Sequence, residues 1–184
     1  DPFIRASDLS PLSAPRALPG VDLDVPGQLA ALALLRYGDE LQRLPLRPTG
    51  NREFYFRNGT YGVGDAEIYY SMIRRLRPRR IVEVGAGNST LLAQLAIEQN
   101  RGEDDGYRCE HICIEPYSND WLETLDVRVV RDKVEDVDPA VVSALGDGDI
   151  FFVDSSHMIR PQGDVLKEVL ELFAEVGVGA YIQV

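Results

Sequence analysis

Short apolar runs and helical stretches alternate along the chain from about residue 80. The apolar runs have the length of strands and fall at 80–84, 110–115, 127–130, 149–154 and 179–184. The helical stretches between most of them fall at about 89–99, 139–145 and 163–176. Strands that alternate with helices indicate βαβ units and a parallel sheet. The pattern therefore predicts the α/β class: a doubly wound, mostly parallel sheet flanked by helices, with ligands bound where its strands end.

The chain before residue 80 follows a different pattern. Residues 1–26 are rich in proline and indicate an extended arm, and residues 27–44 predict a helix that is interrupted at Gly38. Asp65 is a candidate N-cap for a further helix. We therefore expect two parts. Residues 1–50 would form an N-terminal arm and helix, acting as a cap or in oligomerisation, and residues 51–184 would form the ligand-binding domain.

Composition and charge narrow the range of partners. The 184 residues carry a formal net charge of −11 at pH 7, with 45% hydrophobic and 27% charged residues. The acidic charge argues against a nucleic-acid surface, which needs clustered cations, and no apolar run reaches the ~18 residues of a membrane span. We expect a cytoplasmic protein that binds a small-molecule substrate and neither nucleic acid nor a membrane. Formation of a homo-oligomer stays open.

The two cysteines, Cys109 and Cys113, flank His111 in the stretch CEHIC. Such a triplet can suggest a metal site. A β-strand, however, places alternate side chains on one face and separates these two cysteines by ~13 Å, which is too far for a disulfide. We therefore interpret the stretch as a strand, and nothing in it points to an oxidising compartment.

The stretch EVGAGNST, residues 83–90, joins the first predicted strand to a helix. Gly85 and Gly87 allow a tight turn and the close approach of a ligand, and the helix start offers free N–H groups. A dinucleotide fingerprint would need a third glycine where Thr90 stands. Glu83 is also atypical beside a pyrophosphate and suits a cationic group, such as the amino group of an amino acid. We interpret the loop as ligand-binding, and a purely structural turn is the alternative.

Two further strand ends carry acidic residues. Glu115 follows the second strand in ICIEP, where an acid can accept both ribose hydroxyls of a nucleoside. Asp154 follows the fourth strand in DIFFVDSSH, and His157 lies three residues later. A turn could bring both into one pocket, where a carboxylate suits Mg²⁺ and a neutral histidine suits general-base work. The alternatives are an exposed acid at Glu115, and a helix cap or hydrogen-bonded turn at Asp154, which Ser155 and Ser156 would serve equally well.

Together, the motifs VEVGAGNST, CIEPY and DIFFVDSSH resemble the class I S-adenosylmethionine-dependent methyltransferases, over roughly residues 54–184. Two features are similar to metal-dependent small-molecule O-methyltransferases. YGVGDAEIYYSMI resembles the segment before the first strand in catechol O-methyltransferase-like enzymes. Asp154 with His157 resembles the ligand-and-base arrangement found there and in macrolide sugar O-methyltransferases. The resemblance implies a Rossmann-like methyltransferase sheet, S-adenosylmethionine as cofactor, and O-methylation of a small hydroxylated metabolite.

The same resemblance implies which residues bind the cofactor. They are Tyr61, Gly62, Val63, Glu83, Gly85, Ala86, Gly87, Asn88, Ser89, Glu115, Pro116, Val134 and Asp154. The first three would line the methionine end of the cofactor. Glu83 would hold the cofactor amino group through the glycine loop, Glu115 would bind the ribose, and Val134 would lie against adenine.

For catalysis, the resemblance implies that Asp154 is a ligand of Mg²⁺ or another divalent cation and that His157 is the general base. The metal would polarise a substrate hydroxyl, His157 would remove its proton, and the oxygen would attack the sulfonium methyl. The other acidic ligands of such enzymes follow the fifth strand, whereas the chain stops at Val184, inside that strand. We therefore expect a sheet truncated after strand five, with its C-terminal strands missing.

Two other functions are compatible with these motifs. A nicotinamide-dependent oxidoreductase would use the same edge of the sheet, although Thr90 at the third glycine position counts against it. A non-catalytic cofactor-binding domain would keep the glycine loop but lack turnover.

Overall fold

The structure is a computed structural model that describes residues 22–117 and 119–184. Contacts divide the chain into two compact units, residues 1–34 and 35–184. The first unit contributes the helix α1 (Val25–Leu32), which has a proline in its first turn and is capped by the Asp24 carboxylate. None of the α1 side chains is buried. Most of the expected N-terminal arm lies outside the described residues.

The predicted helix over 27–44 is interrupted, as expected near Gly38. α1 ends at Leu32, and the short helix α2 spans Gly38–Leu41 in the second unit. Glycine at this point favours a break because it has a low helix propensity. Leu41 is buried in the core of the second unit, and Glu40 pairs with Arg74. The second unit therefore begins earlier in the chain than the expected boundary at residue 50.

A five-stranded, fully parallel sheet forms the centre of the second unit. Its strands are β1 (Arg80–Val84), β2 (Glu110–Ile114), β3 (Arg128–Val130), β4 (Ile150–Val153) and β5 (Tyr181–Gln183). Each strand lies within one of the predicted apolar runs. The spatial order β3-β2-β1-β4-β5 is that of a doubly wound sheet, with its switch point between β1 and β4. The predicted α/β, Rossmann-like fold class is therefore confirmed.

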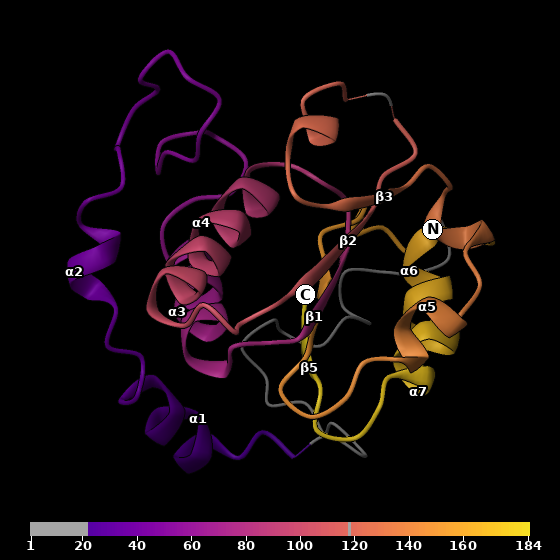
Figure 1. Cartoon of the computed structure of the whole chain (residues 1–184). Helices are drawn as coiled ribbons and strands as arrows, with labels where there is room; N and C mark the ends of the chain where they lie inside the picture. Colours follow the sequence, from indigo (N-terminus) through magenta and orange to yellow (C-terminus); the bar gives the residue numbers. More distant parts are fainter. Residues whose placement is uncertain (1–21, 118) are drawn as a thin grey trace, which may run out of the picture. The chain divides into compact units, whose positions relative to one another are not determined.

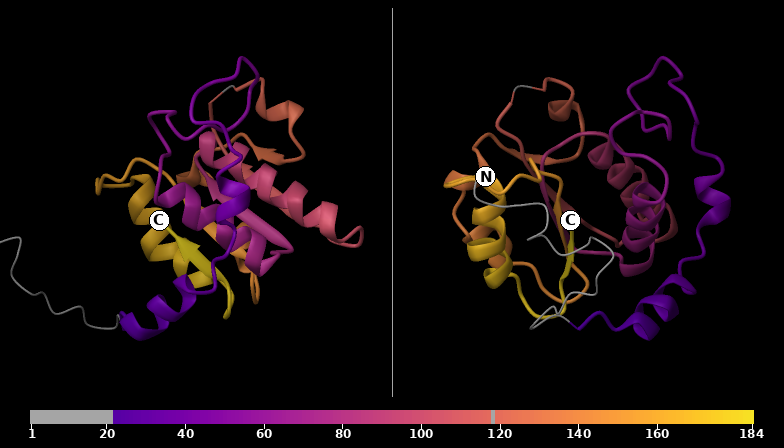
Figure 2. Two further views of the ribbon diagram at one scale, coloured as in Figure 1. Left: turned by 90° about the vertical axis from the view of Figure 1, so that its left-hand side faces the viewer. Right: turned by 180° about the vertical axis from the view of Figure 1, so that it is seen from behind.

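Helices cover both faces of this sheet (Figure 1). One face carries α3 (Asp65–Leu76) and α4 (Asn88–Glu103), and the other carries α5 (Ala140–Ser143), α6 (Asp164–Lys167) and α7 (Phe173–Glu175). Figure 2 shows the same two layers from behind. The 3-10 segments η2 (Leu122–Thr124) and η3 (Val134–Asp136) follow β2 and β3, and the π-helical segment η4 (Glu168–Leu172) joins α6 to α7. No helix in the described parts of the chain is long and apolar enough to cross a membrane.

The strands supply a core to each layer because successive side chains point to opposite faces. Val82 and Val84 of β1 join the core beneath α5 to α7, whereas Ile81 joins the core beneath α3 and α4. Glu83 shares the Ile81 face and is fully buried there. A carboxylate in such a position needs polar partners, because an unpaired buried charge is very costly.

Arg74 connects three helices on the α3–α4 face. Its side chain is 3% exposed, and it donates to Glu40 of α2 and to Asn100 and Glu103 of α4. These contacts hold the pKa of Glu40 below its usual value, chiefly through the hydrogen bond from Arg74. Arg74, the first residue of the basic stretch RRLRPRR at 74–80, is thus a buried structural cation.

Candidate functional site

The ends of β1, β2 and β4 surround a cavity of about 510 Å³, which we call the main cavity. Its lining residues are Val84, Gly85, Ile114, Glu115, Pro116, Tyr117, Lys133, Val134, Glu135, Asp154, Ser155, Ser156, Arg160 and Asp164. This is the position at which doubly wound sheets bind ligands. The structure therefore brings together five of the sequence-predicted residues, Gly85, Glu115, Pro116, Val134 and Asp154.

Gly85 makes the sharp turn between β1 and the cavity. Its φ of +81° lies in the left-handed region, and an added Cβ would lie 2.2 Å from the carbonyl oxygen of Asp154. Gly87 differs, because its backbone is extended at φ −169° and no atom would lie within 4 Å of an added Cβ. The expected tight turn thus depends on Gly85 alone, and Gly87 leaves open space at the start of α4.

The first turn of α4 is closed by Thr90, the residue at the third glycine position. Its hydroxyl accepts the backbone N–H of Gly87 at 2.9 Å, and its side chain is fully buried. Asn88 donates its amide to the Thr60 hydroxyl at 2.8 Å, which ties the loop to the segment before α3. Neither Asn88 nor Ser89 lines the main cavity.

Glu115 lies in the wall of the main cavity and is 7% exposed. One carboxylate oxygen accepts the N–H of Ala86 at 3.1 Å, and the other accepts the N–H of Tyr117 at 2.8 Å. These bonds fix the carboxylate between the glycine loop and the end of β2. Because each carboxylate oxygen can accept more than one hydrogen bond, capacity remains for hydroxyl groups of a ligand.

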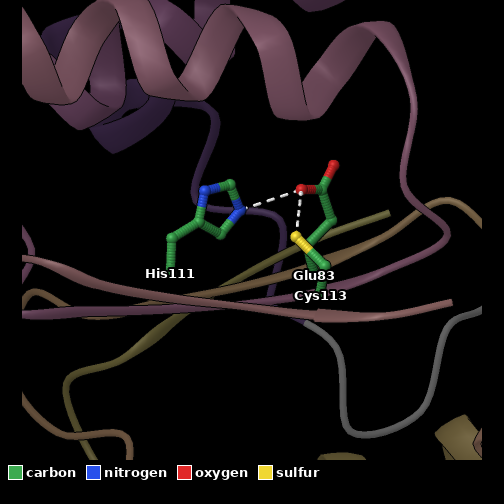
Figure 3. Close-up of side chains that lie close together, drawn as sticks. All are labelled: Glu83, His111 and Cys113. Atoms are coloured by element: carbon green, nitrogen blue, oxygen red, sulfur yellow. Dashed lines mark hydrogen bonds and ion pairs between the residues drawn. The ribbon is translucent and has the colours of Figure 1, made fainter. Parts of the chain in front are cut away.

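Glu83 does not line the main cavity, and its carboxylate lies beside His111 and Cys113 (Figure 3). Its Oε1 accepts the Ser89 hydroxyl at 2.5 Å, and its Oε2 lies 2.8 Å from Nε2 of His111. Gln94 contacts the other His111 nitrogen at 2.9 Å. Because Glu83 does not line the main cavity, it has no direct contact with a ligand held there. Any influence on the cavity passes through Ser89 and the glycine loop, in keeping with the indirect role expected from the sequence.

The predicted strand at CEHIC is confirmed as β2, and both cysteines are free and buried. In the described parts of the chain, Glu83, His111 and Cys113 form the group of metal-ligand side chains whose donor atoms lie within 4.8 Å of one another. Burial and Glu83 raise the pKa of the Cys113 thiol well above its ordinary value, which favours a neutral S–H that points at Glu83. The arrangement is a hydrogen-bonded network that the sequence did not reveal.

A second cavity of about 250 Å³, the side chamber, lies where β4 and β5 end. Its lining residues are Thr60, Tyr61, Asp65, Phe152, Val153, Asp154, His157, Gln183 and Val184. His157 Nε2 lies 3.1 Å from Asp154 Oδ1, so the predicted turn does bring this pair into one pocket. Asp154 lines both cavities and lies between them. The side chamber also includes Thr60, Asp65 and Gln183, which the sequence motifs did not identify as site residues.

The turn that carries this pair is supported from α6 and η4. Ser155 donates to Glu168 Oε2 at 3.0 Å, and Ser156 donates its hydroxyl and its backbone N–H to Asp164, both at 2.8 Å. Burial raises the pKa of Glu168 above its ordinary value. His157 has a positive φ of +55°, which few non-glycine residues adopt without such support. The two serines are therefore turn formers.

Two residues of the segment before α3, Tyr61 and Val63, line different hollows. Tyr61 lines the side chamber, and its ring packs edge-on against Phe152 at 5.7 Å. Val63 is 72% exposed and lines a separate hollow with residues from α2 and the loop that follows it. Val63 therefore lies apart from Tyr61, and its expected place at the methionine end of the cofactor stays a prediction.

No known protein-family profile matches the chain. A protein of Archaeoglobus fulgidus, described only as uncharacterized, is 32% identical over 126 residues, which cover 65% of this chain and 55% of that protein. The chain thus spans about half the length of this relative. A solved structure described as a putative protein-L-isoaspartate O-methyltransferase from Plasmodium falciparum, in complex with S-adenosyl-L-homocysteine, has 14% identity and a TM-score of 0.35, covering 53% of this chain and 51% of that one. The fold assignment rests on the sheet of this chain itself.

Proposed function

We propose that the chain is an S-adenosylmethionine-dependent methyltransferase that binds its cofactor in the main cavity. The observation that carries this proposal is Glu115, whose carboxylate is fixed in the cavity wall by the N–H groups of Ala86 and Tyr117. An acid at the end of the second strand is the group that accepts ribose hydroxyls in sheets of this kind. Val134 and Pro116 add apolar surface to the same cavity and suit the adenine ring.

The side chamber suits the transfer step. S-adenosylmethionine would supply the methyl group on its sulfonium. Asp154 borders both cavities, so a cofactor in the main cavity would present its reactive end toward the chamber. An acceptor in the chamber would then lie beside the pair Asp154 and His157, held for in-line attack by orientation.

His157 is the proposed general base for a hydroxyl acceptor. Because an ionised carboxylate only accepts hydrogen bonds, its contact with Asp154 assigns the hydrogen to Nε2 and leaves the Nδ1 lone pair free. Nδ1 would take the hydroxyl proton as the oxygen attacks the methyl carbon, and the electrons of the broken C–S bond would remain on sulfur. Asp154 would stabilise the imidazolium that forms.

The divalent cation implied by the sequence resemblance does not fit the described residues. Asp154 and His157 supply two donor atoms, and no group of three metal-ligand side chains in residues 22–117 and 119–184 includes either of them. The base mechanism above needs no metal from this chain, and no step is assigned to one.

Calorimetry with S-adenosylhomocysteine tests the cofactor assignment. We expect micromolar binding by the intact chain, and Glu115→Ala is expected to weaken it by about tenfold or more, because hydrogen bonds to a charged group are lost. Glu110→Ala, at the opposite end of β2, is the matched control and is expected to bind normally. Absence of binding by the intact chain would overturn the proposal, and binding of NADH in its place would favour an oxidoreductase.

A further inference from the structure

The buried group of Glu83, His111 and Cys113 combines three kinds of metal donor (Figure 3). A carboxylate oxygen, an imidazole nitrogen and a sulfur lie within 4.8 Å of one another. Glu83 of β1 is the cross-strand neighbour of Cys113 of β2, and His111 lies two residues before Cys113 on the same face. The spacing of the donors is therefore fixed by two paired strands, which hold a site more firmly than a loop does.

The distances within this group suit one ion after a small adjustment. Glu83 Oε2 lies 2.8 Å from His111 Nε2 and 3.7 Å from the Cys113 sulfur. Bonds of about 2.0–2.3 Å from zinc to oxygen, nitrogen and sulfur place the ligands of one tetrahedral ion about 3.2–3.8 Å apart. The sulfur and oxygen already have this separation, and the nitrogen and oxygen need to part by about half an ångström.

The charge of the Glu83 carboxylate also favours a cation at this place. Its side chain is 0% exposed and lies at ion-pair distance from His111, and no lysine or arginine of the described residues pairs with it. A buried carboxylate is costly unless a positive charge compensates it. Zn²⁺ held by one carboxylate, one thiolate and one neutral imidazole would form a group with no net charge. The ion would thus neutralise a carboxylate that the network alone only hydrogen-bonds.

A fully buried hydroxyl on the same side of the sheet has no hydrogen-bond partner among the described residues. It belongs to Tyr69 of α3, whose ring stacks at 4.3 Å on Phe152, the β4 neighbour of Glu83. Burial raises the pKa of this phenol well above its ordinary value, and the charged neighbours that add to the rise are led by Glu83 and include Cys113. A buried polar atom without a partner indicates a missing water or ion. The Tyr69 hydroxyl would complete the coordination, directly or through a water molecule.

We propose that Glu83, His111 and Cys113 bind a zinc ion that stabilises the sheet beneath α4. None of the three lines the main cavity or the side chamber, so the site is structural and independent of the proposed methyl transfer.

Zinc binding changes the protonation of its ligands. Zinc replaces the hydrogen of the Cys113 thiol, which leaves as a proton. At His111 the hydrogen moves from Nε2 to Nδ1, where Gln94 would accept it through its amide oxygen after a turn of the amide. One proton is therefore released for each ion bound.

Cobalt(II) is the spectroscopic probe for this site, because it adopts the geometry of zinc and its bond to a thiolate gives a charge-transfer band. The chain is produced in minimal medium with either zinc or cobalt added, so that the ion enters while the buried site forms. After dialysis against EDTA, the bound metal is measured by mass spectrometry and the absorption spectrum is recorded. Cys113→Ser removes the sulfur ligand, and Cys109→Ser is the matched control at the other free, buried cysteine.

We expect about one zinc ion per chain and a thiolate–cobalt band, both in the original chain and in Cys109→Ser. In Cys113→Ser the band should vanish and the metal content should fall about tenfold or more, since one of three protein ligands is lost. Absence of bound metal in the original chain would overturn the inference and leave a hydrogen-bonded network. A band that survives in Cys113→Ser, or that is lost in Cys109→Ser while this variant keeps its circular dichroism spectrum, would overturn it as well.

Discussion

Glu83 with His111 and Asp154 with His157 are both carboxylate–imidazole pairs, with contact distances of 2.8 and 3.1 Å. Their surroundings differ. The side chains of the first pair are fully buried, whereas the side chains of His157 and Asp154 are 56% and 44% exposed. Ser89 and Gln94 complete the hydrogen bonds of the first pair, while the second pair faces an open chamber. The buried pair therefore has a structural role, because protein groups supply all of its hydrogen-bond partners. The exposed pair can still form hydrogen bonds with a ligand.

The two pairs should differ most in their effect on the rate of methyl transfer. His157→Ala is expected to reduce methyl transfer by ~10²–10⁴-fold, because it removes the proposed general base. The free energy of unfolding should change by no more than about 0.5 kcal/mol, since the side chain is exposed. The measurements are single-turnover kinetics with saturating cofactor and acceptor, and urea denaturation. An unchanged rate would mean that His157 has only a structural role in its turn.

The buried pair should show the opposite result. His111→Ala is expected to lower the free energy of unfolding by about 3–5 kcal/mol, because it leaves the Glu83 carboxylate buried with one partner fewer. The midpoint of urea denaturation measures this loss. The double variant His111→Ala with Glu83→Gln is the control. It is expected to lose less than the sum of the single losses, since no unpaired charge remains. A loss below about 1 kcal/mol in His111→Ala would mean that the network contributes little to folding.

The sequence predicted the fold well because its signal is periodic. Each strand falls within a predicted apolar run, and the helix after EVGAGNST begins where the glycines end. The pairing of Glu83 with His111 was missed because it depends on the register of β1 against β2, in which Glu83 lies beside Cys113. The sequence motif alone did not show that Val63 lines a different hollow from Tyr61. The side chamber was missed because Gln183 is distant in sequence from Thr60 and Asp65 and shares no motif with them.

Gly85 lies between the two pairs, since it follows β1, which carries Glu83, and a Cβ added to it would lie 2.2 Å from the carbonyl oxygen of Asp154. Gly85→Ala is expected to lower the free energy of unfolding by about 1–3 kcal/mol, because the new methyl would meet that carbonyl and φ is positive. Gly87→Ala is the matched control, with extended backbone and open space around the new methyl. It should leave the free energy of unfolding nearly unchanged, as urea denaturation would show. Equal destabilisation by both changes would contradict the distinct roles assigned to the two glycines.

The smallest effect concerns Glu168, which supports the exposed pair through Ser155. Burial raises the pKa of this carboxyl, so the folded chain holds its proton to a higher pH than the unfolded chain does. The stability that this proton contributes is therefore complete below the unfolded pKa of about 4.3 and is lost as pH rises through the folded pKa. Glu168→Gln keeps a hydrogen-bonding amide beside Ser155 and removes the titration. In urea denaturation measured as a function of pH, Glu168→Gln should lack this loss of stability with rising pH. Glu171→Gln, at an exposed position of the same segment, should keep it. A decline that survives in Glu168→Gln would show that another group titrates there, and that Glu168 supports the turn as an ordinary carboxylate.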